Sequence, residues 1–217
     1  MKETTSPTTT STNRYTRNTP TDSVLFGGNL SNGDQVTITR IGESIGTFYG
    51  YETIGIFQNQ QEVDQYASLP NQDPGDLRYK DQNGDGEITE EDRTTIGSPI
   101  PDFTFGLGFT VAYKGLKLTA DFQGQYGNEI YNAKNQTRFS VYNFEDRVIN
   151  RWTAPGTSTS EPDLDSKAGN YEPSDYFVED GSYVRLRNLT LSYAFPQQYL
   201  DGIGFRSATI YLRANNL

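Results

Sequence analysis

The sequence predicts an all-β fold, an antiparallel transmembrane β-barrel segment with long loops, and three observations support this. Aromatic residues make up 13% of the 217 residues, with 15 Tyr, 12 Phe and 21 Gly, while only 33% of residues are hydrophobic. Such a composition argues against wholesale disorder and is typical of strands that have one apolar and one polar face. Two stretches of about 11 residues alternate apolar and polar side chains. Short turns also alternate with long polar connections, as in outer-membrane barrels.

The strongest strand signal follows Asp102. Every second residue from Phe103 to Tyr113 is apolar, with Thr, Gly or Ala between. Lys114-Gly115 is expected to form a tight turn that leads into a return strand from Leu116 to Tyr126. Strands of about 9–11 residues are long enough to cross a bilayer, so this hairpin is the core of the prediction.

Polar residues on these strands are candidate lumen-facing residues. On the return strand these are Asp121, Gln123 and Gln125. In a barrel they would either contact a passing solute or only hydrate the wall. In a later strand, Arg185 and Arg187 share a face with Tyr183, for which we expect a salt-bridge network in the lumen rather than substrate binding.

A secreted, calcium-stabilised β-sandwich that binds carbohydrate is the alternative reading of the alternation. Strands in soluble proteins average about 5–6 residues, so the length of the two strands favours the barrel. The two folds differ in one respect. A barrel exposes Phe103, Phe105, Leu107 and Phe109 to lipid, whereas a sandwich buries them in its core.

The rest of the chain is divided by composition. Residues 1–35 are predicted to be a flexible Ser/Thr/Asn-rich extension or loop, and residues 36–217 to be barrel with its loops. Residues 128–176 are polar and predict a long loop region. We also expect extended segments over 36–41 and 46–57, short helices over 60–68 and 143–152, and a second strand pair over 182–195 and 205–217.

Composition excludes several functions. The net charge of -10 disfavours nucleic acid as a partner. The absence of Cys and His removes thiol catalysis, Ser-His-Asp triads and Cys- or His-ligated metals. The acidic pairs Glu90-Glu91 and Glu179-Asp180 show no glycosidase geometry. We assign no catalytic residue and predict that the protein is not an enzyme.

One motif predicts a metal site. Residues 81–92, DQNGDGEITEED, match the D-x-[DN]-x-[DN]-G calcium loop. The expected Ca²⁺ ligands are the side chains of Asp81, Asn83, Asp85 and Asp92 and the carbonyl of Glu87. Because the preceding residues look extended, the loop would lie outside an EF-hand and serve a structural role. The alternative is an Asn/Asp/Gly turn that needs no metal.

Several stretches resemble the SusC/RagA family of TonB-dependent transporters. They occur in order and cover about residues 36–217. They are Gly46–Tyr51 (GTFYGY), Gly55–Gln58 (GIFQ), Gly75–Asp81 (GDLRYKD) running into NGDG, Asp92–Pro99 (DRTTIGSP), Phe122–Asn128 (FQGQYGN), Glu179–Leu191 (EDGSYVRLRNLTL) and Ala214–Leu217 (ANNL).

The resemblance implies a C-terminal portion of a 22-stranded, plugged barrel in the outer membrane of a Gram-negative bacterium. Such proteins pair with a SusD-type surface lipoprotein and import oligosaccharides or peptides, using energy that TonB passes to a plug segment. The signal peptide, TonB box and plug are absent from residues 1–217. The resemblance therefore implies that Met1 is an internal or mispredicted start and that this part alone does not transport.

Overall fold

The chain divides into two compact units. The computed structural model describes residues 8–11, 24–137, 145–164 and 169–216. Unit 1 comprises Met1–Asn13, Pro101–Asn128 and Gly181–Leu217, and unit 2 comprises Arg14–Ile100 and Glu129–Asp180. Among the described residues, no helix has the length and apolar character needed to cross a bilayer.

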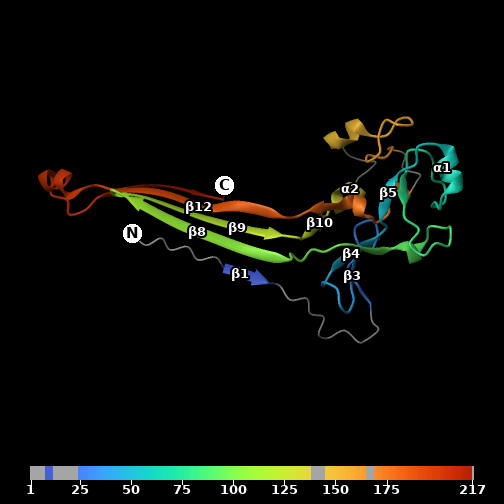
Figure 1. The fold of residues 1–217 in the computed structure, drawn as a ribbon, viewed down its shortest axis with the longest axis horizontal. Helices are drawn as coiled ribbons and strands as arrows, with labels where there is room; N and C mark the ends of the chain where they lie inside the picture. Colours follow the sequence, from blue (N-terminus) through green and yellow to red (C-terminus); the bar gives the residue numbers. More distant parts are fainter. Residues whose placement is uncertain (1–7, 12–23, 138–144, 165–168, 217) are drawn as a thin grey trace. The chain divides into compact units, whose positions relative to one another are not determined.

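Unit 1 is a single antiparallel sheet with the strand order β1-β8-β9-β12-β13. Figure 1 shows β8, β9 and β12 running side by side as long strands. Two 3-10 helices, η5 and η6, lie between β12 and β13. The element bounds are β1 Thr8–Ser11, β8 Phe103–Tyr113, β9 Leu116–Tyr126, β12 Tyr183–Ala194, η5 Gln197–Tyr199, η6 Asp201–Ile203 and β13 Thr209–Asn215.

The β8–β9 hairpin confirms the predicted strands and turn. Tyr113 pairs with Leu116, so Lys114 and Gly115 form a two-residue loop. Both have positive φ, 47° and 86°, as a type I′ turn requires. This turn type matches the twist of the flanking strands and fixes their register. The second predicted pair is also present, as β12 and the shorter β13.

The described part of unit 2 contains three small antiparallel sheets, with orders β2-β3-β4-β7, β5-β6 and β10-β11. Its strands are β2 Leu25–Phe26, β3 Thr37–Thr39, β4 Thr47–Gly50, β5 Thr53–Ile56, β6 Leu77–Tyr79, β7 Thr94–Gly97, β10 Glu129–Tyr131 and β11 Val178–Asp180. Its helices are α1 Gln60–Gln65, α2 Ala133–Thr137 and the 3-10 turns η1 Glu90–Asp92, η2 Asp146–Asn150, η3 Gly169–Tyr171 and η4 Asp175–Phe177.

Ordered elements occur in both ranges for which the sequence predicts loops. Within residues 1–35 the structure places β1 and β2, and most of the remainder lies outside the described residues. Within 128–176 it places β10, α2 and three 3-10 turns. The helix expected over 60–68 ends at Gln65, because Tyr66 is extended (φ -112°, ψ 154°). That expected over 143–152 is the 3-10 turn η2, with residues 143–144 outside the described part.

The core of unit 2 is aromatic and joins both of its chain segments. A cluster of buried side chains forms around β5 and β6: Tyr51, Ile56, Leu77, Tyr79, Ile88 and Trp152. Polar contacts connect the same two segments. Asn170 accepts from the Leu77 amide and donates to Asp76, each at 2.7 Å, while Asp175 accepts from both the amide and hydroxyl of Thr53.

Tyr79 is the central residue of this core, and its substitution tests how unit 2 is held together. It is fully buried, and its hydroxyl donates to the Gly169 carbonyl. We expect Tyr79→Ala to destabilise unit 2 by about 3–5 kcal/mol through the cavity it leaves, and Tyr79→Phe by about 1 kcal/mol through the lost hydrogen bond. Amide hydrogen exchange of β5 and β6 in the intact protein measures both. Equal exchange in the alanine variant and the wild type would contradict this packing.

Candidate functional site

The polar face of unit 1 is the candidate functional site, and strand register creates it. Alternate residues of a strand point to opposite faces. The pairings place Gln125 beside Thr104, Gln123 beside Gly106 and Asp121 beside Gly108. All three predicted lumen-facing residues therefore lie on one face, and β12 adds Tyr183, Arg185 and Asn188 opposite them.

A ladder of side-chain hydrogen bonds crosses this face. Asn188 donates to Asp121 at 2.9 Å. Thr190 donates to the Asn188 side-chain oxygen and accepts from the Arg213 Nε at 3.3 Å. The Thr110 and Thr119 hydroxyls lie 3.0 Å apart. The bond between Thr190 and Asn188 lies within β12. The other three connect facing positions on neighbouring strands, which stabilises a sheet through its cross-strand pairs.

Glycine provides the space that Asp121 needs. A Cβ on Gly108 would lie 2.7 Å from the Asp121 Oδ1, closer than side chains tolerate. A Cβ on Gly106 would meet nothing closer than 3.8 Å, an ordinary contact. Both glycines leave the β8 side of the face flat, and at Gly108 an added Cβ would displace the Asp121 carboxylate.

A β-bulge in β12 changes which residues share this face. The register shifts between Leu186 and Asn188, so Arg187 is the extra residue. Its carbonyl accepts from the Asn216 amide at 3.1 Å. A bulge bends a strand and redirects side chains. Here Arg187 and Asn188 both line the same concavity as Asp121.

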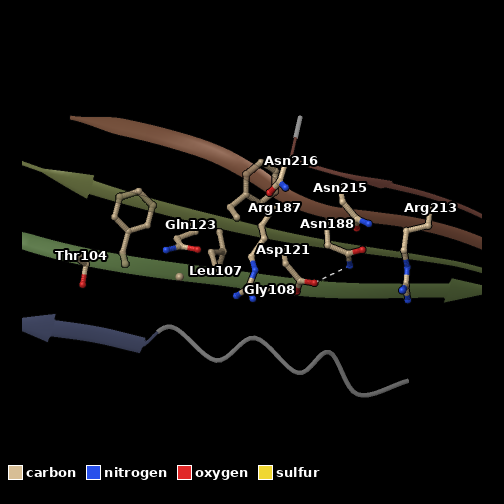
Figure 2. A pocket seen from close by; sticks show the side chains of 13 residues that line it. Thr104, Leu107, Gly108, Asp121, Gln123, Arg187, Asn188, Arg213, Asn215 and Asn216 are labelled. Carbon is tan, nitrogen blue, oxygen red and sulfur yellow. Dashed lines mark hydrogen bonds between the residues drawn. The ribbon is translucent and has the colours of Figure 1, made fainter. Parts of the chain in front are cut away.

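This concavity has a volume of about 800 Å³ and is lined by β8, β9, β12 and β13. Thr104, Asp121, Arg187 and Arg213 point to the same side of the sheet in Figure 2. The expected salt-bridge network is not found among the described residues, since none of their carboxylates forms an ion pair with Arg185 or Arg187. Arg185 instead stacks on the Tyr183 ring, 4.7 Å from its centre.

The opposite face of the sheet is apolar and exposed. Leu107 is 43% exposed, Val111 52% and Leu212 73%. Unit 1, as far as it is described, contains a single sheet, so no second sheet covers these side chains. The alternative fold, a sandwich that buries Phe103 and Leu107, is therefore wrong for this unit.

The predicted calcium loop is closed by hydrogen bonds to its own backbone. Asp81 accepts from the amides of Gly84 and Gly86 through its two oxygens. The Asn83 oxygen accepts from the Asp85 amide and Asp85 from the Glu87 amide, both at 2.9 Å. Within the described residues, no group of three or more Asp or Glu side chains is placed to hold a metal ion.

Asp92, the predicted ligand at position twelve, has a capping role that the sequence did not indicate. It is fully buried, and it accepts from the amides of Gln82, Asn83 and Thr89. With Thr89 it forms a capping box at the start of η1. Burial favours a raised pKa of the Asp92 carboxyl, but these backbone donors outweigh burial and lower the pKa below its usual value.

Comparison with known proteins identifies the family. No family model matches the chain. A TonB-dependent receptor of Formosa agariphila is 35% identical over 204 residues, which is 90% of this chain and 20% of that receptor. The TonB-dependent receptor SusC of Bacteroides thetaiotaomicron is 26% identical over 192 residues, covering 84% of this chain and 17% of SusC. The chain belongs to the SusC/RagA family of TonB-dependent receptors. It spans about a fifth of the length of the curated relatives it matches.

Solved structures of the family agree with the fold. A structure of the RagAB peptide transporter superposes with a TM-score of 0.62 at 24% identity, over 88% of this chain and 20% of that chain. The RagAB peptide importer in its open-open state gives 0.59 at 26% identity, over 89% and 21%. The all-β, antiparallel barrel-segment prediction is therefore confirmed, and the sheet of unit 1 is a SusC/RagA-type barrel segment without a closed barrel of its own.

The sequence contains a signal for the bulge that simple alternation misses. Leu186 and Leu189 are separated by two polar residues, whereas Leu189 and Leu191 are separated by one. An extra residue in the strand is the only way to keep all three on one face. The bulge in this receptor segment, and with it the position of Arg187, is thus readable from the spacing of leucines.

Substitution of the two β8 glycines tests the polar face of the receptor. We expect Gly108→Ala to displace Asp121, break its bond to Asn188 and cost about 1–2 kcal/mol. Gly106→Ala is the matched control and should be neutral or slightly stabilising, since Ala loses less entropy in a strand. The temperature at which the folded full-length receptor unfolds in detergent compares the two. The same unfolding temperature for both variants would refute the close contact.

Proposed function

We propose that this chain forms part of the wall of an outer-membrane TonB-dependent transporter in a Gram-negative bacterium. The whole receptor would import oligosaccharides or peptides together with a SusD-type lipoprotein, driven by TonB through a plug segment. The observation that supports this proposal most directly is that the sheet of unit 1 has one exposed apolar face and one polar face. A barrel wall between lipid and an aqueous lumen needs those two faces.

Strand length and aromatic positions support the membrane assignment. β8 and β9 have 11 residues each, which at about 3.3 Å per residue and with the usual tilt crosses an apolar band of about 25 Å. Phe103 stacks on Tyr126 at one end of the hairpin, with ring centres 5.5 Å apart. Tyr193 and Phe195 contact each other near the opposite end, at 5.1 Å. Aromatic residues at both ends suit the two membrane interfaces.

The connections give the sheet an orientation in the proposed membrane. Lys114-Gly115 and residues 195–208 are the short links, and both join strands at the same end of the sheet. The links from β1 to β8 and from β9 to β12 are long and leave from the other end. Outer-membrane barrels have short periplasmic turns and long extracellular loops. The residues of unit 2 would then be extracellular.

The solute and partner assignments come from the relatives. RagAB is described as a peptide transporter, and SusC as a TonB-dependent receptor. The RagAB description supports a peptide as solute. The oligosaccharide alternative and the lipoprotein partner are what the sequence resemblance to the SusC/RagA family implies. Unit 2 has its own core of buried side chains, which would keep it folded as an extracellular segment.

Charge placed on one face or the other tests the wall assignment. Leu107→Arg puts a cation on the proposed lipid face near mid-strand and should cost about 2–4 kcal/mol. Gln123→Arg, on the exposed polar face, is the control and should be tolerated. The amount of folded full-length receptor in the outer-membrane fraction measures both. Normal assembly of the Leu107 variant would refute the assignment.

We also propose that residues 81–92 bind Ca²⁺ as a structural ion. The ligand spacing of Asp81, Asn83, Asp85 and the Glu87 carbonyl supports it. The two oxygens of a carboxylate offer about four lone-pair sites. The Asp92 carboxylate accepts hydrogen bonds from three backbone amides, so about one lone-pair site is left for a cation. If bound, the ion would supply charge neutralisation and cross-linking of the loop.

Calcium binding is tested on the full-length receptor by calorimetry. We expect a dissociation constant of about 0.1–1 mM, as in extracellular calcium modules, and loss of the binding heat in Asp85→Ala, which removes a ligand oxygen. Glu91→Gln is the control, because Glu91 is exposed and lies outside the ligand positions. The absence of heat with millimolar calcium, or equal heat in both variants, would show that the loop is a metal-free turn.

A further inference from the structure

The polar face of unit 1 is positively charged although the chain as a whole is acidic. The net charge of the 217 residues is -10. On β8, β9, β12 and β13, however, the charged side chains are four cations and one anion: Lys117, Arg185, Arg187, Arg213 and Asp121. Register places Lys117, Arg185 and Arg213 beside Ser192, Gln123 and Thr190, all on the polar face. Selective placement of cations on one wall makes a local positive potential.

Arg187 is a cation of this face that forms no ion pair with any described residue. It is exposed. Asp121, the anion of this face, accepts instead from Asn188. The Arg187 backbone is fixed by the bulge and by the Asn216 amide. An exposed arginine on a fixed backbone is available for a ligand.

The surroundings of Arg187 favour an oxyanion. Gly106 and Gly108 line the same concavity as Arg187 and have no side chains to fill it. Figure 2 shows Gly108 beside Arg187 and Asp121. Arg213 donates through Nε to Thr190, which orients its guanidinium within the same concavity. A guanidinium binds a carboxylate with two parallel hydrogen bonds. Amides of Gln123, Asn188 and Asn215 in the same lining can bind the neutral polar groups of such a ligand.

We propose that Arg187, assisted by Arg213, binds carboxylate groups of an acidic solute on the lumen wall. This inference rests on the proposed function, since it takes the polar face as the lumen. It adds the substrate class: an acidic oligosaccharide or an acidic peptide, bound through a carboxylate common to both. The alternative partner for Arg187 is a carboxylate from elsewhere in the receptor. The experiment below distinguishes a solute carboxylate from a receptor carboxylate.

The experiment uses the full-length receptor and two pairs of probes matched except for the carboxylate. Trigalacturonate is compared with galactotriose, and triglutamate with triglutamine, by calorimetric titration in detergent; both peptides are N-acetylated and C-amidated, so that only the side chains differ in charge. The variants are Arg187→Gln and Arg213→Gln. Arg206→Gln is the matched control, because Arg206 is exposed and lies between η6 and β13, outside the four strands.

We expect at least one acidic probe to bind about tenfold more tightly than its neutral partner, with Arg187→Gln removing that preference. Arg213→Gln should weaken it less, and Arg206→Gln should leave it unchanged. The preference should fall as salt is raised. The pair that shows it identifies the solute as saccharide or peptide.

Four results would overturn the inference. They are equal binding of acidic and neutral probes, no binding of either acidic probe, equal binding by the Arg187 and Arg206 variants, and a lower unfolding temperature of solute-free Arg187→Gln with unchanged binding. The last would assign Arg187 to a carboxylate within the receptor.

Uptake by cells with and without the receptor gene is measured in parallel. Receptor-dependent uptake of neutral probes alone would leave the proposed function standing, whereas the absence of receptor-dependent uptake for all four probes would count against the function itself.

Discussion

The register of β8, β9, β12 and β13 is the constraint on which unit 1 depends. Strand side chains alternate with a period of two, so a slip of one residue would turn every apolar side chain of a strand to the polar face. In hydrocarbon the backbone must also be fully hydrogen-bonded. The type I′ turn at Lys114-Gly115 sets the register of the first pair. The bulge at Arg187 resets it in β12, so that Leu189 and Leu191 stay on the same side as Leu186.

Unit 2 is held together differently, because its described strands are only two to four residues long. Residues 14–100 and 129–180 are separated in the sequence by a full hairpin, yet they share one core. Tyr79 packs there with aromatic and aliphatic side chains, and the buried Asn170 adds hydrogen bonds to Leu77 and Asp76. Arg93 stacks on Tyr51 and pairs with Glu172 at 3.2 Å. Burial raises the pKa of the Glu172 carboxyl, an effect that the nearby Arg93 charge opposes.

Sequence reasoning recovers the long strands because their signal is local. Alternation from Phe103 to Tyr126 gives β8 and β9 with their turn, and the same alternation places Asp121, Gln123 and Gln125 on one face. It does not recover elements held by distant partners. β10 and β11 are three residues each and pair across 47 positions or more, so no local pattern marks them. The capping role of Asp92 was missed because an acidic residue at position twelve of a calcium pattern fits a ligand equally well.

Positive and negative side chains are distributed unequally between the strands of unit 1 and the rest of the chain. The cations of the strands lie on the polar face, so the remaining residues are more acidic than the net charge of -10 suggests. At physiological ionic strength charges farther apart than about 8 Å are largely screened. Acidic residues of unit 2 beyond that distance would therefore do little to oppose an anion at the wall. Discrimination between acidic and neutral solutes would then depend on the charged residues that line the same concavity, which are Arg187, Arg213 and Asp121.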